Sequence, residues 1–334
     1  MKNDIRIFNC TFVKTVLMVL IVIYHGCALW TNNWGGFPRI QAPKIGFFAE
    51  WLNSFHIYSF TLVSGYIFYY KKNELHQYDD FVAFIYKKVK RLLIPFYVVG
   101  IMWVIPFEII FSKQGVSFAL RFILGISTSQ LWFLFMLFDV FIVAFVLNKL
   151  IYKQDINSIA ICLISWFFGK LGNKYFLNVF QIFSAFQFIP YFIIGMKLRE
   201  HKKILQYLMK YRIIFMLLLG DVMLFTMLCV YKMNGAPKIT LYILGAVTAF
   251  ISLQKCGEIF YGWSESQIFG FLTRFSFSVF LFHQQIIYIT NGLFDGVFNP
   301  YLNAGLNICI SMLVALIISS LIYRFKFCRI FIGG

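Results

Sequence analysis

Charged side chains are scarce in this chain, and their scarcity excludes an ordinary soluble protein. Lys, Arg, Asp and Glu make up 13% of the 334 residues, against about 25% in a typical soluble domain. Only 13 residues are acidic, and no long polar stretch offers a separate soluble domain. By contrast, 60% of the residues are hydrophobic and 21% are aromatic. The composition therefore predicts a polytopic membrane protein.

Close pairs of cysteines are lacking as well. The seven cysteines lie mostly inside apolar runs, at Cys10, Cys27, Cys162, Cys229, Cys256, Cys309 and Cys328. This spacing indicates neither a disulfide framework nor a metal site, so we expect small core residues and no bound metal. No internal repeat is visible in the sequence, and the absence of paired halves counts against a transporter.

Apolar segments of the length needed to cross a membrane, about 20 residues, recur along the whole chain. The ten segments cover residues 11–31, 47–70, 92–111, 130–151, 156–171, 179–197, 211–231, 239–255, 267–290 and 304–325. We expect an all-α fold, a bundle of about ten transmembrane helices with a polar interior that forms a single domain over residues 1–334. The fifth and eighth segments are short for a full crossing, so nine and eleven are the alternative counts of transmembrane helices. Residues 115–130 are expected to form an amphipathic or re-entrant piece.

The first apolar run is a membrane helix in this interpretation and not a signal peptide, because no small-x-small cleavage site follows it cleanly. Two strongly polar residues interrupt it, Lys14 and His25. They lie roughly 16 Å apart along a helix axis and on broadly the same side. An ionisable group inside a membrane helix usually faces a cavity and serves a function, which is why we expect a polar interior.

The net charge of +17 is explained by orientation and anionic lipid, and we expect no nucleic acid partner. Alternate connections between the apolar segments hold twenty and eight Lys and Arg residues, respectively. Because positive residues accumulate on the cytoplasmic side, both termini are predicted to be cytoplasmic in a multi-pass protein of the cell membrane.

Three of the five histidines, His25, His56 and His283, lie inside apolar segments. In the predicted orientation they lie roughly 9, 14 and 10 Å below the outer surface. Histidines at matched depth can converge on one site, whereas the alternative is that each one packs against a neighbouring helix. His76 and His201 lie in basic connections and are interpreted as solvated.

Cations form a complementary pattern on the predicted cytoplasmic side. Lys14, Arg91 and Arg274 lie near the inner ends of their segments, where they either anchor the helices or bind a phosphate-bearing ligand. Ser64, in a mid-helix Ser-Gly pair, allows close approach of a helix or a ligand. Trp132 fits an interfacial anchor.

Acidic residues are few within the segments. The candidates are Glu50, Glu108, Asp139 and Asp221, and one of them could orient His25. Spacing does not choose among them.

Six motifs occur in order along the chain: a lysine followed eleven positions later by His25, then FHIYSFTLVSGY, RLLIPF, LWFLFMLF, PYFIIGMKL and FSFSVFLFHQQI. In this order the sequence resembles the acyltransferase-3 family of integral-membrane acyltransferases over nearly its whole length. The resemblance implies a ten-helix domain that transfers an acyl group, usually acetyl from cytoplasmic acetyl-CoA, to a hydroxyl of a surface glycan or its lipid-linked precursor. It makes His25 the catalytic residue and Lys14 and Arg91 contacts of the acyl donor.

The chain departs from the family pattern at Lys14, where arginine is commoner. Lysine keeps the charge but loses the bidentate geometry of the guanidinium. We also expect no appended esterase-like domain, so that a single membrane unit does the whole reaction.

The leading hypothesis is a membrane O-acetyltransferase acting on a cell-surface or capsular polysaccharide. His25 acts as general base or accepts the acyl group transiently, with Arg274 added to the donor site. His56, Ser64, His283 and Trp132 are assigned to acceptor binding or support. The expected partners are acetyl-CoA as donor substrate with no bound cofactor, a glycan or lipid-linked glycan, and membrane lipids; a homo-oligomer stays open. The alternatives are an exporter of a glycan or small molecule and a scaffold of a glycan-synthesis complex.

Overall fold

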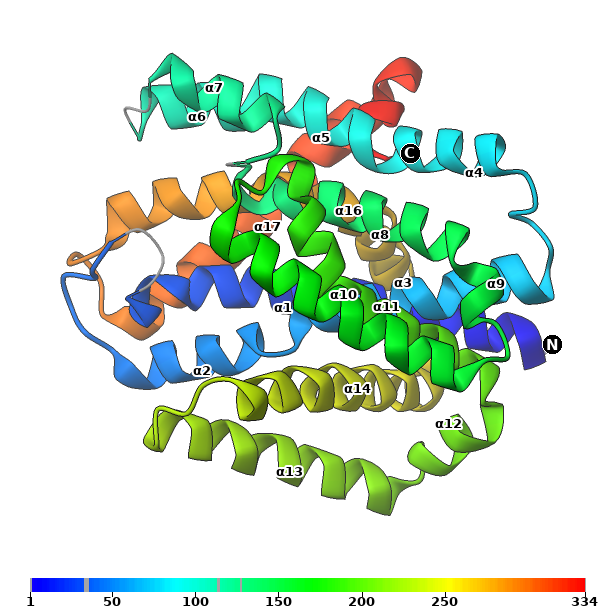
Figure 1. The fold of residues 1–334 in the computed structure, drawn as a ribbon. Helices are drawn as coiled ribbons and strands as arrows, with labels where there is room; N and C mark the ends of the chain where they lie inside the picture. The colour runs from blue at the N-terminus through cyan, green and yellow to red at the C-terminus, as the bar shows by residue number, and fades with distance from the viewer. Residues whose placement is uncertain (1, 33–35, 113–114, 127, 334) are drawn as a thin grey trace. The chain divides into compact units, whose positions relative to one another are not determined.

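The structure is a computed structural model that describes residues 2–32, 36–112, 115–126 and 128–333, with side chains from Asn9 onward. Among these residues every regular element is helical (Figure 1), which confirms the all-α prediction. The helices are α1 Lys2–Cys27, α2 Pro43–Asn53, α3 His56–Tyr69, α4 Phe81–Lys88, α5 Ile94–Val99, α6 Ile105–Ile110, α7 Val116–Ile123, α8 Trp132–Val146, α9 Asn148–Ile151, α10 Asp155–Tyr175, α11 Ile182–Glu200, α12 Lys202–Leu208, α13 Tyr211–Val230, α14 Ala236–Ile259, α15 Tyr261–Ser264, α16 Gln267–Phe294 and α17 Pro300–Arg324.

Seven helical segments within the described residues are long and apolar enough to span a membrane. They are Asn9–Thr31, Phe81–Ile110, Ser129–Val146, Val179–Glu200, Tyr211–Val230, Ala236–Ile259 and Pro300–Arg324. The chain is therefore an all-α polytopic membrane protein, while the count of ten stays a prediction. Residues 33–35, 113–114 and 127, which fall in two predicted outer connections, lie outside the described residues.

The second predicted segment, 47–70, is not one continuous helix. It breaks after Asn53 into α2 and α3, and the Ser54 hydroxyl donates a hydrogen bond to the Trp51 carbonyl at 2.7 Å. Serine and asparagine offer the backbone hydrogen bonds that compete with a continuing helix. As a consequence His56 is the first residue of a new helix and not a residue in the middle of a long one.

The third predicted segment keeps its helical course but changes its hydrogen-bond register twice. The backbone N–H of Ile94 bonds to the Val89 carbonyl, and that of Ile105 bonds to the Gly100 carbonyl. Both residues precede a proline, which has no N–H to donate and clashes with the preceding turn. A π-helical turn before each proline accommodates this interruption.

The chain divides into two compact units, each built from two stretches of sequence. The first contains residues 1–67 and 195–315, and the second contains residues 68–194 and 316–334. The single functional domain over residues 1–334 stays a prediction. The two units are described separately below.

In the first unit α1 packs against α16 and α14, and α13 packs along α14 as an antiparallel neighbour (Figure 1). The rings of Phe12 and Phe269 stack at 5.3 Å between α1 and α16. Gly195, at the C-terminal end of α11, lies directly on α3, where a Cβ would collide with the Leu62 carbonyl. These close approaches bring polar residues of α1, α3 and α16 into one interior.

The second unit has an aromatic core. Phe96 stacks on Phe122 with 5.0 Å between ring centroids, and Phe68 packs against Phe192 at 5.5 Å. Asn73 and Asn148 exchange two amide hydrogen bonds at 3.3 and 2.9 Å. These two hydrogen bonds join the π-helical turn Tyr70–Glu74 to the start of α9, so polar as well as aromatic contacts stabilise the second unit.

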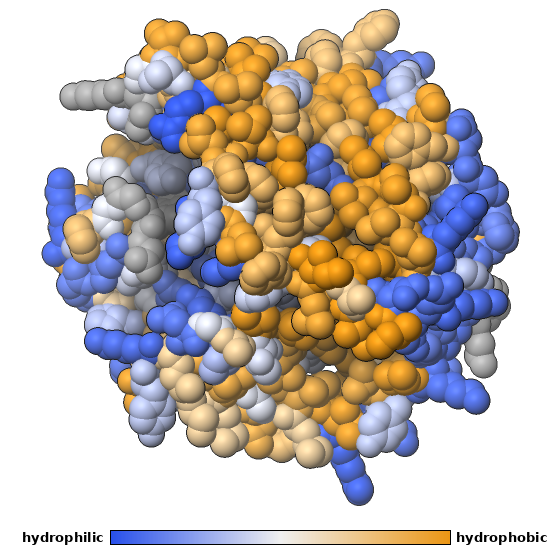
Figure 2. Space-filling view, in the orientation of Figure 1, coloured by the Kyte–Doolittle hydropathy of each residue, from blue (hydrophilic) through white to orange (hydrophobic). Residues whose placement is uncertain are grey.

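The surface carries large apolar side chains, as expected of helices that face lipid. The face drawn in Figure 2 is largely hydrophobic, and α13 exposes about two thirds of Phe215 and Met216. In contrast, α16 buries a run of polar residues that comprises Ser278, His283, Gln284, Gln285, Thr290 and Asn291. Polar groups are thus directed inward, which supports the predicted polar interior.

Candidate active site

Two histidines form the centre of the candidate site in the first unit. His25 lies in the last turn of α1, and its Nδ1 is 2.6 Å from Nε2 of His283 on α16. Their rings are nearly parallel, with 21° between the planes. His283 is fully buried whereas His25 is half-buried, so His25 is the more exposed ring of the pair.

The hydrogen bonds of His283 determine which nitrogen of His25 is basic. Nδ1 of His283 lies 3.1 Å from the Val279 carbonyl and 2.9 Å from the Phe280 carbonyl. Carbonyl oxygens only accept, so Nδ1 of His283 carries the proton and its Nε2 accepts. His25 must then donate from Nδ1, which leaves the lone pair of the neutral His25 ring on Nε2.

A third histidine, His56, lies near this pair, and the Tyr24 ring contacts both His25 and His56. The ring centroid of Tyr24 is 4.8 Å from that of His25 and 4.9 Å from that of His56. Nδ1 of His56 donates to the Leu52 carbonyl at 2.7 Å across the break between α2 and α3. The three histidines that the sequence placed at matched depth are therefore brought together in one unit, with Tyr24 as an unpredicted member.

The sequence offered four carboxylates as candidates to orient His25, whereas the hydrogen-bond partner in the structure is His283. Asp221 accepts a hydrogen bond from the Trp51 indole at 3.0 Å, which ties α13 to α2. Glu50 is close enough to the Tyr24 hydroxyl to interact with it electrostatically. Glu108 and Asp139 belong to the second unit.

Buried amides support the backbone next to His25. Nδ2 of Asn307 on α17 donates to Oδ1 of Asn291 on α16 at 2.5 Å and reaches the Gly26 carbonyl at 3.4 Å. Both asparagines are buried. This contact was not predicted, although Asn303, Asn307 and Ser311 recur every four residues in an otherwise apolar helix and so indicate a buried polar face.

Cations of the first unit gather where α1 meets α16 and where α11 meets α3. The hydroxyls of Thr15 and Thr273 are 3.0 Å apart, which brings their neighbours Lys14 and Arg274 to the same level of the two helices. Lys14 is half-buried, whereas Arg274 is exposed.

Arg199 is a buried cation near the end of α11 that was not among the predicted site residues. Only 1% of it is exposed, and its Nη1 donates to the Tyr66 hydroxyl at 3.1 Å. The guanidinium also lies 5.3 Å from the centre of the Tyr66 ring. A signal was available in the sequence, because Arg199 is four residues after Gly195 and therefore shares the helix face that presses on α3.

The remaining predicted donor contact, Arg91, belongs to the second unit. Burial lowers the pKa of Lys71, and the positive charges of Arg91 and Lys87 lower it further. Burial also raises the pKa of Tyr78, with Arg91 acting in the opposite direction. Several cations of this unit are therefore close enough to repel one another, an arrangement that an anion would relieve.

The sequence matches a known protein family over nearly its whole length. The family model described as an acyltransferase domain matches residues 10–324. The chain belongs to the acyltransferase-3 family. No curated protein and no solved structure matches it. Membership confirms the family that the six motifs indicated and makes the chain a membrane acyltransferase.

The other two predicted site residues of this acyltransferase have packing contacts. The Ser64 hydroxyl donates to the Phe60 carbonyl one turn earlier, at 2.9 Å. Trp132, in the second unit, meets the Phe188 ring edge-on at 5.7 Å. These contacts explain both residues without a ligand, and their assignment to acceptor binding stays a prediction.

Proposed function

We propose that the protein is a membrane O-acetyltransferase that moves acetyl from cytoplasmic acetyl-CoA to a hydroxyl of a cell-surface or capsular polysaccharide or its lipid-linked precursor. The observation that supports this most strongly is the His25–His283 hydrogen bond. It gives the half-buried His25 a basic Nε2 in a family of acyltransferases.

In the proposed reaction Nε2 of His25 removes the proton of the acceptor hydroxyl as its oxygen attacks the thioester carbonyl. The new C–O bond forms, the C–S bond breaks, and the proton passes from Nε2 to the departing thiolate. The products are the acetyl ester and free coenzyme A. Nδ1 of His25 stays bonded to His283 throughout, which holds the ring in one orientation.

Transient transfer of acetyl to Nε2 of His25 is the other route that this geometry allows. The C–S bond then breaks first and the thiolate leaves. In a second step the acceptor oxygen attacks the acetyl carbon, the C–N bond to Nε2 breaks, and the hydroxyl proton passes to the thiolate. Both routes need the same lone pair on Nε2. Both routes therefore predict that acetyl transfer is lost when the imidazole of His25 is removed.

Cations on the inner side would hold the donor. Lys14, Arg274 and Arg199 of the first unit offer positive charge to the phosphates of acetyl-CoA. Taken by itself, the second unit offers Arg91 and Lys71, whose mutual repulsion an anionic phosphate would relieve. The burial of Arg199 and the mutual repulsion around Lys71 support this assignment. The pantetheine arm would then extend through the polar interior toward His25.

The proposed orientation has both termini in the cytoplasm and the protein in the cell membrane. It rests on the twenty-to-eight asymmetry of Lys and Arg between alternate connections. In this orientation the histidines lie in the outer half, where an acceptor glycan arrives, and the cations face the cytoplasmic donor.

Membranes from cells with and without the protein test this function. Supplied with acetyl-CoA labelled in the acetyl group, membranes that contain the protein should incorporate label into an alkali-labile ester on the surface glycan. Mass spectrometry and proton NMR of that glycan should show the added acetyl groups. Equal labelling and identical glycans in the two preparations would reject the proposal.

A further inference from the structure

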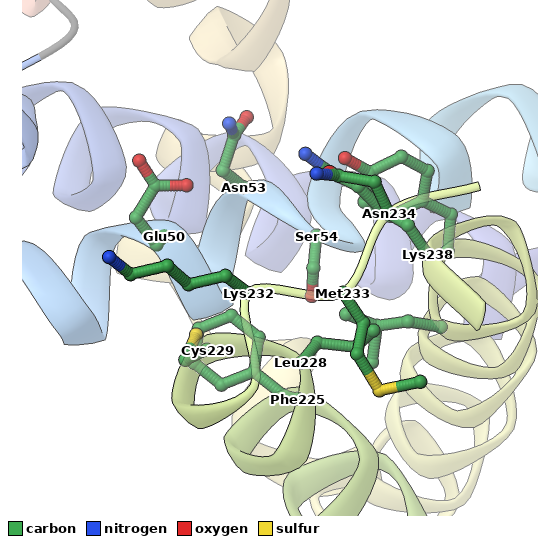
Figure 3. A pocket seen from close by; sticks show the side chains of 12 residues that line it. Glu50, Asn53, Ser54, Phe225, Leu228, Cys229, Lys232, Met233, Asn234 and Lys238 are labelled. Carbon is green, nitrogen blue, oxygen red and sulfur yellow. The ribbon is translucent and has the colours of Figure 1, made fainter.

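A pocket opens in the first unit where the C-terminal end of α2 meets α13, α14 and the connection between them (Figure 3). Its volume is about 310 Å³, at the lower end of the roughly 300 to 1,000 Å³ usual for small-molecule sites. In the proposed orientation the pocket faces the outside. None of the reactive histidines lines it.

The pocket has one polar and one apolar side. Polar ends of Glu50, Asn53 and Asn234 lie along one side in Figure 3. The opposite side is formed by Phe225, Leu228 and Met233. Amides and a carboxylate can pair with both the donors and the acceptors of sugar hydroxyls, while the apolar side can cover the C–H face of a sugar ring.

Glu50 connects this pocket to the histidines. Its carboxylate lines the pocket and also interacts electrostatically with the Tyr24 hydroxyl. Tyr24 in turn contacts both His25 and His56. A molecule in the pocket is therefore next to the element that carries the proposed base.

Positive charge outweighs negative charge in the lining. Lys232 and Lys238 line the pocket with one acid, Glu50. Both lysines are exposed, and the described residues provide neither of them with an ion pair. Lys238 lies 5.9 Å from the Tyr242 ring, which stacks on Tyr58 at 4.6 Å. The two cations at an open pocket favour an anionic ligand.

We propose that this pocket binds an acidic sugar unit of the acceptor, adjacent to the unit whose hydroxyl reaches His25. The proposal rests on the proposed glycan acetyltransferase function and adds to it the chemical class of the acceptor. Lys232 and Lys238 bind the carboxylate or phosphate of that unit, and Glu50 and Asn53 bind its hydroxyls.

Chemical modification of Cys229 can report ligand binding in the pocket without any acetyl transfer. Its side chain is exposed and lines the pocket. The full-length protein in lipid nanodiscs is treated with a maleimide, and the rate of modification of Cys229 is measured by peptide mass spectrometry. Three probes are compared: an oligosaccharide that contains uronate, a phosphodiester-linked oligosaccharide and a neutral oligosaccharide of the same length.

At least one acidic probe should slow modification of Cys229 by about tenfold under conditions where the neutral probe has little effect. Protection by the uronate probe identifies a carboxylate, and protection by the phosphodiester probe identifies a phosphate. The double variant Lys232→Glu/Lys238→Glu should lose the protection. The matched control Lys170→Glu/Lys174→Glu changes the same charge outside the pocket and should keep it.

Equal protection by the neutral probe, no protection by either acidic probe, or full protection in the Lys232→Glu/Lys238→Glu variant would each overturn the proposal. Labelling of Cys229 uses no acetyl-CoA. A negative result in this experiment therefore rejects the binding pocket without rejecting the proposed acetyl transfer. A protein that acetylates glycans but shows no protection rejects the pocket alone. A protein that shows protection but transfers no acetyl rejects the reaction alone.

Discussion

Replacement of His283 by leucine would remove the acceptor of the His25 Nδ1 hydrogen bond. The 2.6 Å contact is then lost, and the His25 N–H is left without that partner or turns to another one. In either case Nε2 of His25 is no longer held in place with its lone pair toward the substrate. Leucine leaves the α1–α16 packing largely filled, so the expected defect is in catalysis.

The size of the defect follows from the energy of the lost hydrogen bond. A buried donor left without its acceptor costs about 1 to 3 kcal/mol. At about 1.4 kcal/mol for each factor of ten, kcat should fall by about 5- to 150-fold. Because the donor site is elsewhere, KM for acetyl-CoA should stay within about twofold.

His283→Gln is the matched control, because its side-chain oxygen can accept the hydrogen bond from Nδ1 of His25. The Gln variant should recover most of the kcat that the Leu variant loses. If His283→Leu acted only by disturbing the packing, the Gln variant would not recover it. The assay is transfer of labelled acetyl at matched abundance of the protein in the membrane. Full kcat in His283→Leu would refute the positioning role, and so would a Gln variant as slow as the Leu variant.

Three further predictions concern other parts of the molecule. Tyr66→Phe removes the hydroxyl that accepts from buried Arg199 and should lower the free energy of unfolding by about 1 kcal/mol; an unchanged SDS titration would contradict this. The pKa of Lys71 lies below the ordinary lysine value of 10.5, so Lys71 loses its charge at a lower pH than an ordinary lysine does. The affinity for coenzyme A should therefore fall as the pH rises toward 10.5. In a Lys71→Gln variant this transition should vanish, whereas a flat wild-type binding curve up to pH 10.5 would reject the role of Lys71. Gly195→Val should collide with the backbone of α3 and reduce folded protein, whereas Gly220→Val, which has no close neighbour, should not; equal yields would contradict the close approach.

The helices could be predicted from the sequence because apolar runs alone delimit them. The predicted segment 211–231 corresponds to α13, Tyr211–Val230, and 267–290 corresponds to most of α16, Gln267–Phe294. The break at Ser54 was missed because it lies inside a long, mostly apolar segment and depends on a local hydrogen bond. Hydropathy does not contain that information.

The site was only partly predictable for a related reason. Depth along a helix placed His25, His56 and His283 at one level, but rotation about the helix axis decides which of them touch. The His25–His283 bond needs the register of α1 against α16, which depends on contacts such as Phe12 with Phe269. Arg199 was missed because composition assigns a cation after an apolar run to the cytoplasm, whereas Gly195 brings its helix close enough to α3 to bury it.

The central claim is that Nε2 of His25 acts on the acceptor or on the acetyl group, and one substitution tests it most directly. His25→Gln keeps a side chain of similar size that can form hydrogen bonds but has no basic nitrogen. Acetate incorporation into the glycan, measured with labelled acetyl-CoA at matched membrane abundance, should fall by about 10²- to 10⁴-fold, the usual contribution of a positioned base. Transfer at a near-normal rate by His25→Gln would contradict the account.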